Sequence, residues 1–497
     1  MVALSLEKIK RGGAGMNFVS KGRNEGIKSV MKDFVERAVN LYENMGDQPV
    51  CPSAREDALE LLRERQVPQE GRPIEEVFEE MLQEVYSGAP LAQHPRNFSC
   101  VPSTASLFSW MGDVMTGAFN PHAGCRSNAP AAGMIEEKLI RWMCGLAGYP
   151  KGSGGVFVSG GSMANLTALT AARDLKLPFS ERSRGVVYVT DQTHSSVSKG
   201  LHIIGFDRQQ IHIVPTDGAF RMNVSALKEA VRKDRAAGKK PFAVVASAGS
   251  TNTGSVDPLR EIGLLCREYN MWMHVDGAFG ASALLSKRQR KLLSGIELSD
   301  SLSWDAHKWM MQTYSCSVVL VRRQSDLLRS FSAHPEYLKD AESAEDGTEF
   351  WDLGPELTRP ARSLKLWLTL QAVGSLGMER MIDHGCAMAE LAERVLRTYP
   401  GWEIVSSASL GIVNFRYVPF GISSESHLNR INQEIAREIT ASGYAQVFTT
   451  ELQGKKVLRM CTIHPQITEE DIHNTIERLR QSEAARRAGR QLDKTAS

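Results

Sequence analysis

An aspartate at the end of an apolar run and a lysine 32 residues after it (308 − 276) are the first residues here that could do chemistry. Lys308 closes Ser303–Lys308 (Ser-Trp-Asp-Ala-His-Lys), and Asp276 ends the apolar run within His274–Ala278 (His-Val-Asp-Gly-Ala). A buried carboxylate is costly without a partner, and a protonated pyridine nitrogen is one such partner. The spacing of the two residues fits one strand-loop-strand step. Taken singly, Lys308 could be a solvated surface lysine and Asp276 could cap a turn.

A glycine-rich turn upstream has the residues of a phosphate site. Phe157–Asn165 (Phe-Val-Ser-Gly-Gly-Ser-Met-Ala-Asn) runs from an apolar strand into a helical pattern through Gly161 and Ser162. Glycines let backbone N–H groups approach an anion, and a helix N-terminus attracts negative charge. The turn lacks the spacings of a nucleotide P-loop and of Gly-x-Gly-x-x-Gly. A purely structural strand-to-helix turn is the alternative interpretation.

Two further polar stretches follow apolar strands. Asp191–Ser196 contains His194, whose imidazole could stack on a planar ring, although a histidine at a strand end is more often a satisfied polar group. Ala248–Gly254 could bring Thr251 to the same place. Pyridoxal 5′-phosphate (PLP) combines a pyridine ring, a phosphate and an aldehyde that a lysine can hold as a Schiff base, so it would use all of these groups.

The elements that must position these residues alternate between strand and helix from about residue 130. This alternation predicts an α/β fold with a mostly parallel sheet covered on both faces, and in such sheets ligands lie beyond the carboxyl ends of the strands. Asp257 before Pro258 predicts an N-cap with proline in the first helical turn. The expected strands are Gly155–Val158, Gly185–Val189, Ile211–Pro215, Phe242–Ala246, Met271–Val275 and Ser317–Val321, and the expected helices are Met163–Asp174, Val224–Arg235 and Pro258–Tyr269.

Two other regions flank this large domain, which is expected to span residues 96–375. Residues 1–95 predict a polar N-terminal extension with amphipathic helices that cover a partner surface, because they have no visible core of their own. Residues 376–497 predict a small α+β domain in which Thr468 caps a late helix. The tail from Glu483 is expected to fray, because few apolar groups are available to dock it.

Composition excludes several classes of function. Lys plus Arg (59) nearly balance Asp plus Glu (57), so the chain has no electrostatic footprint for nucleic acid or for an anionic membrane. No long apolar run predicts a membrane span, and the first residues lack the pattern of a secretory signal. The eight cysteines form no Cys-x-x-Cys pair, which favours reduced thiols, a cytoplasmic protein and no metal site.

Together these motifs resemble the group II PLP-dependent amino acid decarboxylases, which have the aspartate-aminotransferase fold (PLP fold type I). The motifs are Gly-Gly-Ser at 160–162, Asp-Gln-Thr-His at 191–194, His-Val-Asp-Gly-Ala at 274–278 and Asp-Ala-His-Lys at 305–308, in the order of the family. Within it, the sequence is most similar to the tryptophan and aromatic-L-amino-acid decarboxylases. The resemblance implies PLP as the cofactor and a homodimer with the site at the subunit interface.

The resemblance also assigns roles to individual residues. Lys308 would hold PLP, Asp276 would pair with the pyridine nitrogen, and His194 would stack on the ring. Many relatives have Asn at the position of Asp305, so this residue departs from the common pattern. The other cofactor-binding residues that the resemblance implies are Gly161, Ser162, Ala278, Thr251 and His307, with Asp305 near the phosphate.

The implied reaction converts an aromatic L-amino acid, tryptophan ahead of phenylalanine or tyrosine, to the amine and CO2. A non-aromatic substrate would remain possible, and Arg96 or Arg126 could serve an acidic one. The segment Lys339–Thr358 has no Tyr where many relatives place one over the site, and in plant relatives its loss favours an oxygen-consuming route to an aldehyde. The residues expected to form the substrate pocket, unless they are core residues, are Phe98, Val101, Pro102, Phe119, His122 and Trp351.

Other classes of function are also compatible with parts of the pattern. Lys308 and Asp276 would serve transamination or β-elimination equally well, so the products must separate these reactions from decarboxylation. A non-enzymatic binding role would not need the combination of lysine, aspartate and histidine, which counts against it.

Overall fold

The computed structural model describes residues 21–52, 56–99, 101, 104–332 and 349–493, in two compact units, Met1–Pro90 and Leu91–Ser497. In the first unit two helices pack through an edge-to-face contact of Phe34 with Phe78, whose ring centroids are 6.0 Å apart. The amphipathic helices expected in this part of the chain are therefore present in the described residues. The elements of this unit are α1 (Lys21–Glu43), α2 (Glu56–Glu64), α3 (Ile74–Glu80) and a π-helical turn (Met81–Tyr86).

The second unit is built on a seven-stranded sheet in which β7 runs antiparallel to both of its neighbours and the other pairs are parallel. The predicted fold class, a mostly parallel α/β sheet, is confirmed. In spatial order the strands are β1 (Gly154–Val158), β7 (Ser317–Val321), β6 (Ser301–Asp305), β5 (Trp272–Asp276), β4 (Lys240–Ser247), β2 (Gly185–Thr190) and β3 (Ile211–Val214).

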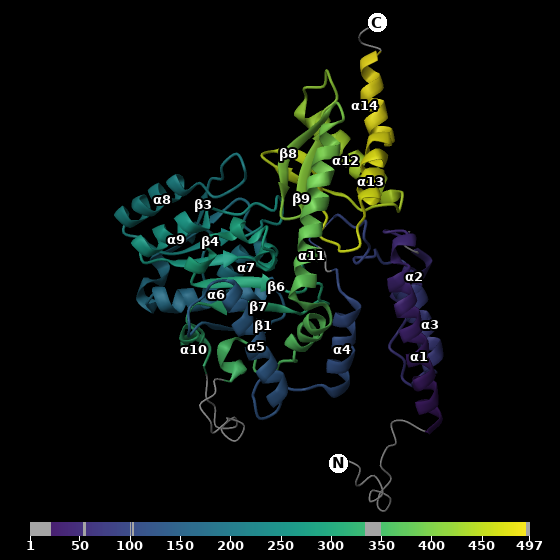
Figure 1. The fold of residues 1–497 in the computed structure, drawn as a ribbon, viewed down its shortest axis with the longest axis horizontal. Helices are drawn as coiled ribbons and strands as arrows, with labels where there is room; N and C mark the ends of the chain where they lie inside the picture. Colours follow the sequence, from purple (N-terminus) through teal and green to yellow (C-terminus); the bar gives the residue numbers. More distant parts are fainter. Residues whose placement is uncertain (1–20, 53–55, 100, 102–103, 333–348, 494–497) are drawn as a thin grey trace, which may run out of the picture. The chain divides into compact units, whose positions relative to one another are not determined.

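Helices cover both faces of this sheet (Figure 1). The chain crosses from β1 to β2 and then to β3 in one direction, and returns through β4 to β5 in the other. Because parallel crossovers are right-handed, the outward and return helices lie on opposite faces. The outward helices are α6 (Gly161–Lys176) and α7 (Ser195–Ile203), and the return helices are α8 (Val224–Ala236) and α9 (Leu259–Glu268).

The sequence did not predict β6 as a strand, although every residue in it is buried. Its sequence, Ser-Leu-Ser-Trp-Asp, alternates polar and apolar residues, whereas neighbouring β7, Ser-Val-Val-Leu-Val, contains a continuous apolar run of the kind that double coverage favours. The serines are tolerated because they find partners. Ser301 accepts a hydrogen bond from Trp272 Nε1 at 2.8 Å, and Ser303 donates to Asp276 Oδ1 at 3.2 Å.

The predicted capping role of Asp257 is wrong. Its carboxylate instead accepts the backbone N–H groups of Met222 and Ser247, both at 2.7 Å, and Pro258 occupies the N-cap position of α9 without a side-chain cap. Asp257 therefore joins the end of β4 to the segment before α8. Burial raises the pKa of this carboxyl to about 6, although the two backbone donors oppose the shift.

Four further helices belong to the described part of this unit. Helix α11 is interrupted at Gly374, where φ is +72° and ψ is 163°, so two helical segments meet there. Its first turn contacts α4, and its later turns contact the second sheet (Figure 1). The bounds are α4 (Leu107–Phe119), α5 (Pro130–Leu146), α10 (Ser325–Phe331) and α11 (Ser363–Arg397).

The second sheet has four antiparallel strands and its own apolar core. Thr468 caps α13 with a capping box that Asp471 completes, as the sequence predicts. The elements are β10 (Phe448–Leu452), β11 (Lys455–Cys461), β9 (Ile412–Tyr417), β8 (Trp402–Ser409), α12 (Glu425–Ala441), α13 (Glu469–Gln481) and α14 (Glu483–Asp493).

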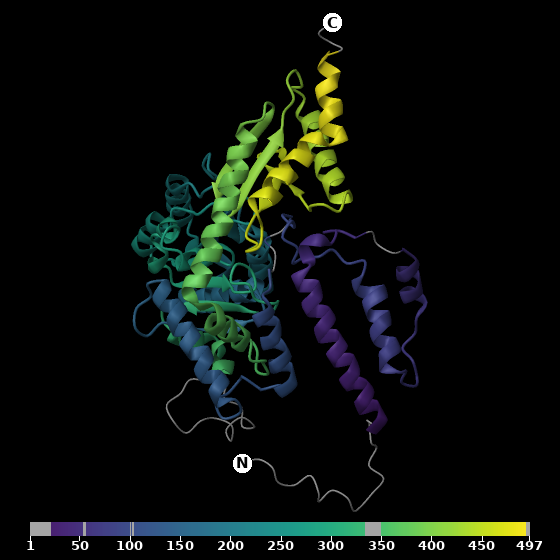
Figure 2. The same ribbon diagram turned by 45° about the vertical axis from the view of Figure 1, so that its right-hand side comes forward.

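The prediction that the chain frays from Glu483 is wrong for the described residues, because α14 is a helix that packs beside α12 (Figure 2). Ala484, Ala485 and Ala488 are buried in the core of the second sheet. The Glu438 carboxylate accepts the backbone N–H groups of Glu483 and Ala484, at 2.6 and 3.0 Å. Small alanines let the helix approach closely, which a search for large apolar residues overlooks.

Seven cysteines in the described part of the chain are free thiols, and six of them are buried. No helix among the described residues is long and apolar enough to cross a membrane. The same residues contain no cluster of three or more His, Cys, Asp or Glu side chains arranged to hold a metal ion.

A histidine between β11 and α13 makes the stability of this unit depend on pH. Burial lowers the pKa of His464 from 6.5 to about 4, so this imidazole stays neutral in the folded chain while it would protonate in the unfolded chain below about pH 6.5. The free energy of unfolding should therefore fall as pH drops from 6.5 to 4, by about 2 kcal/mol at pH 5.

Urea denaturation at pH 7.5 and pH 5 tests this expectation with His464→Asn, whose side-chain oxygen can keep the hydrogen bond that Nδ1 accepts from Gln466 N. The variant should lose about 2 kcal/mol less than the parent over this range. His473→Asn, at an exposed position of α13, is the control and should behave as the parent does. Equal losses in all three chains would contradict the prediction.

Candidate active site

A cavity of about 510 Å³ opens at the carboxyl ends of β1, β2, β4, β5 and β6. The structure brings all nine predicted cofactor-binding residues together at this cavity, as expected for the strand ends of such a sheet. The residues that line it are Ser159, Gly160, Gly161, Ser162, Asn165, Gln192, His194, Ser196, Ser247, Gly249, Ser250, Thr251, Asp276, Ala278, Phe279, Asp305, His307, Lys308, Tyr314 and Ser315.

Asp276 is the last residue of β5, in register with Ser247 of β4 and Ser303 of β6. One carboxylate oxygen accepts from Ala278 N at 3.1 Å and Ser303 Oγ at 3.2 Å, and the other accepts from Asn165 Nδ2 at 3.0 Å. Burial alone would raise the pKa of Asp276, but the Lys308 ammonium and these donors outweigh it and hold the pKa below its usual value. Asp276 is therefore a fixed buried anion.

A relay of hydrogen bonds orients the Asn165 amide toward Asp276. His274 Nε2 contacts Asn165 Oδ1 at 2.9 Å, and His274 Nδ1 contacts Ser301 Oγ at 2.8 Å. Burial lowers the pKa of His274 to about 4, so the ring is neutral and carries one proton. Because the Asn165 oxygen can only accept, that proton lies on Nε2, and the amide NH2 is directed toward Asp276.

Lys308 follows β6 and lies beside a second carboxylate. Its Nζ is 3.0 Å from Asp305 Oδ2, and Asp305 is only 1% exposed. Burial alone would lower the pKa of Lys308, but Asp305 and Asp276 together raise it above its usual value. Lys308 is thus an ammonium that must give up a proton before it can act as a nucleophile, and Asp305 Oδ2 is the acceptor in contact with it.

The glycine-rich turn forms the N-terminus of α6 and faces this pair. Gly160 is the N-cap residue and supplies no side-chain hydrogen bond to the first turn. A Cβ atom on Gly161 would lie 2.7 Å from Asp305 Oδ2 and 3.2 Å from Ala278 Cβ, so only glycine fits there. The described N-terminal backbone of α6, Lys308 and Asp276 therefore offer an anion site, an amine and a carboxylate in one cavity, which are the groups that PLP requires.

His194 caps α7 with its imidazole. Nδ1 accepts from Ser196 N at 3.2 Å and lies 2.8 Å from Ser196 Oγ. The neutral ring must then carry its proton on Nε2. Ser196 Oγ in turn accepts the second N–H of Asn165 at 3.0 Å, so His194 is connected to the network around Asp276. The predicted stacking role of His194 stays a prediction.

Thr251 lines the cavity from the loop after β4, which the second sheet helps to hold. The next residue, Asn252, donates to Gln192 Oε1 at 3.2 Å, and its backbone oxygen accepts from Asn414 of β9 at 3.0 Å. Thr450 of β10 donates to Asn252 Oδ1 at 3.0 Å. The loop is therefore held by polar contacts with both sheets.

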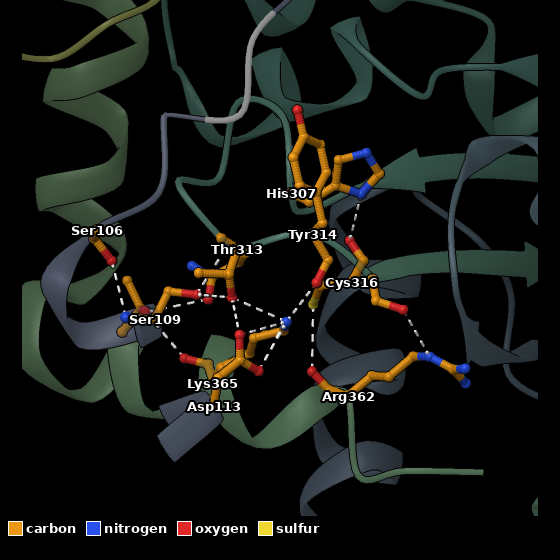
Figure 3. Close-up of polar contacts among 12 residues, drawn as sticks. Ser106, Ser109, Asp113, His307, Thr313, Tyr314, Cys316, Arg362 and Lys365 are labelled. Atoms are coloured by element: carbon orange, nitrogen blue, oxygen red, sulfur yellow. Dashed lines mark hydrogen bonds and ion pairs between the residues drawn. The ribbon is translucent and has the colours of Figure 1, made fainter. Parts of the chain in front are cut away.

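His307 and Tyr314 form another wall, with ring centroids 5.7 Å apart (Figure 3). Burial lowers the pKa of His307, so this ring is neutral. Its Nδ1 lies 3.3 Å from Cys316 O and 3.1 Å from Ser317 Oγ. Because a carbonyl can only accept, Nδ1 carries the proton, and Nε2 lies 3.7 Å from Asp305 Oδ2.

None of the predicted substrate-pocket residues that the structure describes lines this cavity. Phe98 requires a correction, because it is fully buried in the core of the second sheet and packs there instead of facing a cavity. Val101 packs against the main core, and Phe119 is 82% exposed on α4. His122 contacts the ring of buried Trp351, with centroids 6.4 Å apart. Pro102 lies outside the described residues.

Sequence reasoning missed several polar residues that complete the site. Asn165 lies four residues after Gly161, a helical spacing that places both on one face of α6. Ser303 precedes Asp305 by two residues, the period at which strand side chains share a face. Tyr314, six residues beyond Lys308, left no comparable signal, because the intervening loop is irregular.

The comparisons with known proteins agree with this geometry. Residues 56–418 match the pyridoxal-dependent decarboxylase conserved domain. An aromatic-L-amino-acid decarboxylase of Bacillus atrophaeus is 38% identical over 439 residues, 88% of this chain and 91% of that protein. A phenylacetaldehyde synthase of Arabidopsis thaliana is 31% identical, with 89% of this chain and 91% of that protein aligned.

Among solved structures, Oryza sativa TDC with PLP and tryptamine superposes with a TM-score of 0.87 at 28% identity, covering 92% of this chain and 97% of that one. The resemblance read from the motifs is thereby confirmed. The chain belongs to the pyridoxal-dependent decarboxylase family and is a PLP-dependent amino acid decarboxylase.

Proposed function

We propose that the protein decarboxylates an aromatic L-amino acid, with tryptophan preferred to phenylalanine and tyrosine, and releases the amine and CO2. The observation that carries the reaction is the single cavity in which Lys308, the Asp276 carboxylate and the N-terminus of α6 meet. The aromatic substrate is supported by the Bacillus atrophaeus relative, an aromatic-L-amino-acid decarboxylase.

Each residue of the cavity has a distinct task in this proposal. PLP, when bound, supplies the electron sink that makes loss of CO2 possible. Asp276 holds the proton on the ring nitrogen, because its own pKa is low and three donors fix its two oxygens. The α6 N-terminus would hold the phosphate of PLP, and Lys308 Nζ is the amine that would anchor its aldehyde group. Asp305 Oδ2 moves the proton to and from Lys308 Nζ, 3.0 Å away.

The charges around the site favour an aromatic over an acidic substrate. The two arginines that could bind an acidic side chain are engaged elsewhere. Arg96 pairs with Asp471 at 3.2 Å and donates to Tyr444 O at 2.8 Å, while Arg126 pairs with Glu137 at 3.2 Å. Neither arginine lines the cavity.

We further propose a cytoplasmic homodimer in which each subunit helps to complete the substrate pocket of the other. The outer face of α4 supports this arrangement, because Met111, Met115 and Phe119 are exposed there by 48%, 53% and 82%. Exposed apolar groups gathered on one helix mark an interaction surface. Phe119 would then reach a pocket that a single chain leaves open. The free cysteines support the location.

A second outcome, oxygen-dependent conversion to an aldehyde, has one observation in its favour. The described end of the segment Lys339–Thr358 carries Phe350 and Trp351, both buried, and no residue of the segment is a tyrosine. One of the aligned relatives is a phenylacetaldehyde synthase. The products therefore decide between the two outcomes.

Lys308→Ala should lose turnover on the order of 10³-fold or more, since this amine would anchor the aldehyde group of PLP. The visible absorbance of bound PLP should disappear while the far-UV circular dichroism stays as in the parent. Lys287→Ala, which removes an exposed lysine, is the matched control and should retain both absorbance and turnover. Turnover by the Lys308 variant comparable to that of the parent would contradict the assignment.

Asp276→Asn should keep PLP bound but lower kcat on the order of 10²-fold or more, because a neutral amide cannot hold the ring nitrogen protonated. The measurement is kcat with absorbance titration of PLP. An unchanged kcat would remove Asp276 from the catalytic set.

A screen of the twenty amino acids tests the substrate and the route together. Tryptophan should give the highest kcat/KM and equal amounts of amine and CO2, with phenylalanine and tyrosine next and glutamate inactive. Hydrogen peroxide and ammonia at the same yield as CO2 would identify the aldehyde route instead. A best substrate without an aromatic ring would overturn the substrate assignment and leave the decarboxylase assignment intact.

A further inference from the structure

The segment between Lys308 and β7 holds two residues in an unfavourable backbone conformation. Met311 and Ser315 have φ angles of +59° and +66°, in the left-handed region that non-glycine residues avoid. Such conformations are unfavourable for residues that carry a Cβ atom and persist only where the surroundings hold them. The segment 311–315 leads the chain from the cofactor lysine past Tyr314, so whatever holds it also shapes the cavity.

A buried lysine of helix α11 contacts this segment and holds it in place. Lys365, in the first turn of α11, is only 4% exposed. Its Nζ donates to Tyr314 O at 2.6 Å and to Thr313 Oγ1 at 3.0 Å, and it lies 3.0 Å from Asp113 Oδ1 (Figure 3). The three N–H donors of the ammonium thus meet three acceptors, two of which belong to the strained segment.

Helix α4 completes the cluster from the other side. Ser109 Oγ accepts from Thr313 N at 2.8 Å, and Thr313 Oγ1 donates to the Asp113 carboxylate. A Cβ atom on Gly112 would lie 2.6 Å from Lys365 Cα, so the two helices can approach this closely only with glycine there. The positions of Lys365 and of the segment are therefore fixed relative to one another.

Tyr314 connects Lys365 with the cavity. Its backbone oxygen is bound by Lys365, while its side chain, 66% exposed in the single chain, lines the cavity with Lys308 and lies against His307. Lys365 itself does not line the cavity. A contact to the main chain of a cavity residue, made from outside the cavity, is how a residue can position the site without touching substrate.

We propose that Lys365 is a positioning residue, which holds the strained segment 311–315 so that Tyr314 forms a wall of the substrate space beside Lys308. The kinetic part of this proposal rests on the proposed function, whereas the structural part does not. Loss of the ammonium would let Met311 and Ser315 relax and would withdraw Tyr314. The binding of PLP would persist, because Asp276 and α6 lie outside this cluster. Asp113 is 43% exposed and can be solvated when its partner is removed.

Hydrogen–deuterium exchange of the PLP-bound protein tests the structural part. Lys365→Met, which keeps the length of the apolar stem, should speed exchange in peptides covering residues 309–316 while PLP absorbance and exchange in β5 stay as in the parent. Lys287→Met is the control for loss of an exposed lysine. Unchanged exchange in residues 309–316 would overturn the proposal, and so would loss of PLP together with general unfolding.

Steady-state kinetics on the best substrate test the link to Tyr314. Lys365→Met and Tyr314→Ala should each lower kcat/KM by about 10- to 100-fold, mainly through KM, because misplacing a wall of the site weakens substrate positioning. The double variant should be no worse than either single variant, since both act through one side chain. Lys365→Arg should recover part of the loss. Additive effects in the double variant would overturn the proposal.

The two sets of measurements separate failure of this inference from failure of the proposed function. If no amino acid is decarboxylated by the parent chain, the proposed function falls, and the exchange of residues 309–316 still decides the role of Lys365. If the parent is active and Lys365→Met matches it in exchange and in kinetics, only the role of Lys365 falls.

Discussion

The site depends on one constraint, which is that the buried carboxylate of Asp276 must stay ionised at the centre of the sheet. Removing a carboxylate from water is costly. Each of its two oxygens therefore needs hydrogen-bond donors, and its negative charge needs a cation. The register of β5 and β6 places Ser303 directly opposite Asp276, and the turn after β5 supplies the backbone N–H of Ala278. The remaining oxygen accepts from Asn165, and the Lys308 ammonium stabilises the negative charge. A carboxylate that these strand ends keep ionised can also pair with the cationic ring nitrogen of a ligand.

Helix α6 sets the distance between the two ends of that ligand. Its N-terminus is the anion site, and Asn165, which bonds Asp276, lies four residues after Gly161 on the same helix, about 6 Å along the axis. The relay from Ser301 through His274 fixes the Asn165 amide, and the second amide N–H leads through Ser196 to His194. The anion site, the carboxylate and the imidazole are thus parts of one hydrogen-bonded network that joins α6, α7, β5 and β6.

Sequence reasoning succeeded where chemistry and local pattern coincide. Strand ends followed by Asp276, His194 and the Gly161 turn were recognisable because a polar residue directly after an apolar run is conspicuous, and the family resemblance was confirmed. It failed where polar residues replace apolar ones, as in β6, where Ser301 and Ser303 carry hydrogen bonds that only the folded neighbours reveal. It also failed for α14, whose packing depends on small alanines. Phe98 shows the reverse error, because an apolar side chain gives no sign of whether it faces a core or a cavity.

The balance of charge in the cavity then specifies what it can bind. Two buried carboxylates, Asp276 and Asp305, face one ammonium at Lys308, while the imidazole of His307 is neutral. Asp305 Oδ1 lies buried against the first turn of α6 without a hydrogen-bond partner. A ligand with only negative charge would be repelled by both carboxylates. A ligand with only positive charge would have no anionic group for the positive end of the α6 dipole. A molecule with a cationic ring at the Asp276 end and an anionic group at the Gly161 end matches the Asp276 carboxylate and the helix dipole, and the Lys308 ammonium offsets the Asp305 carboxylate that lies beside the Gly161 end.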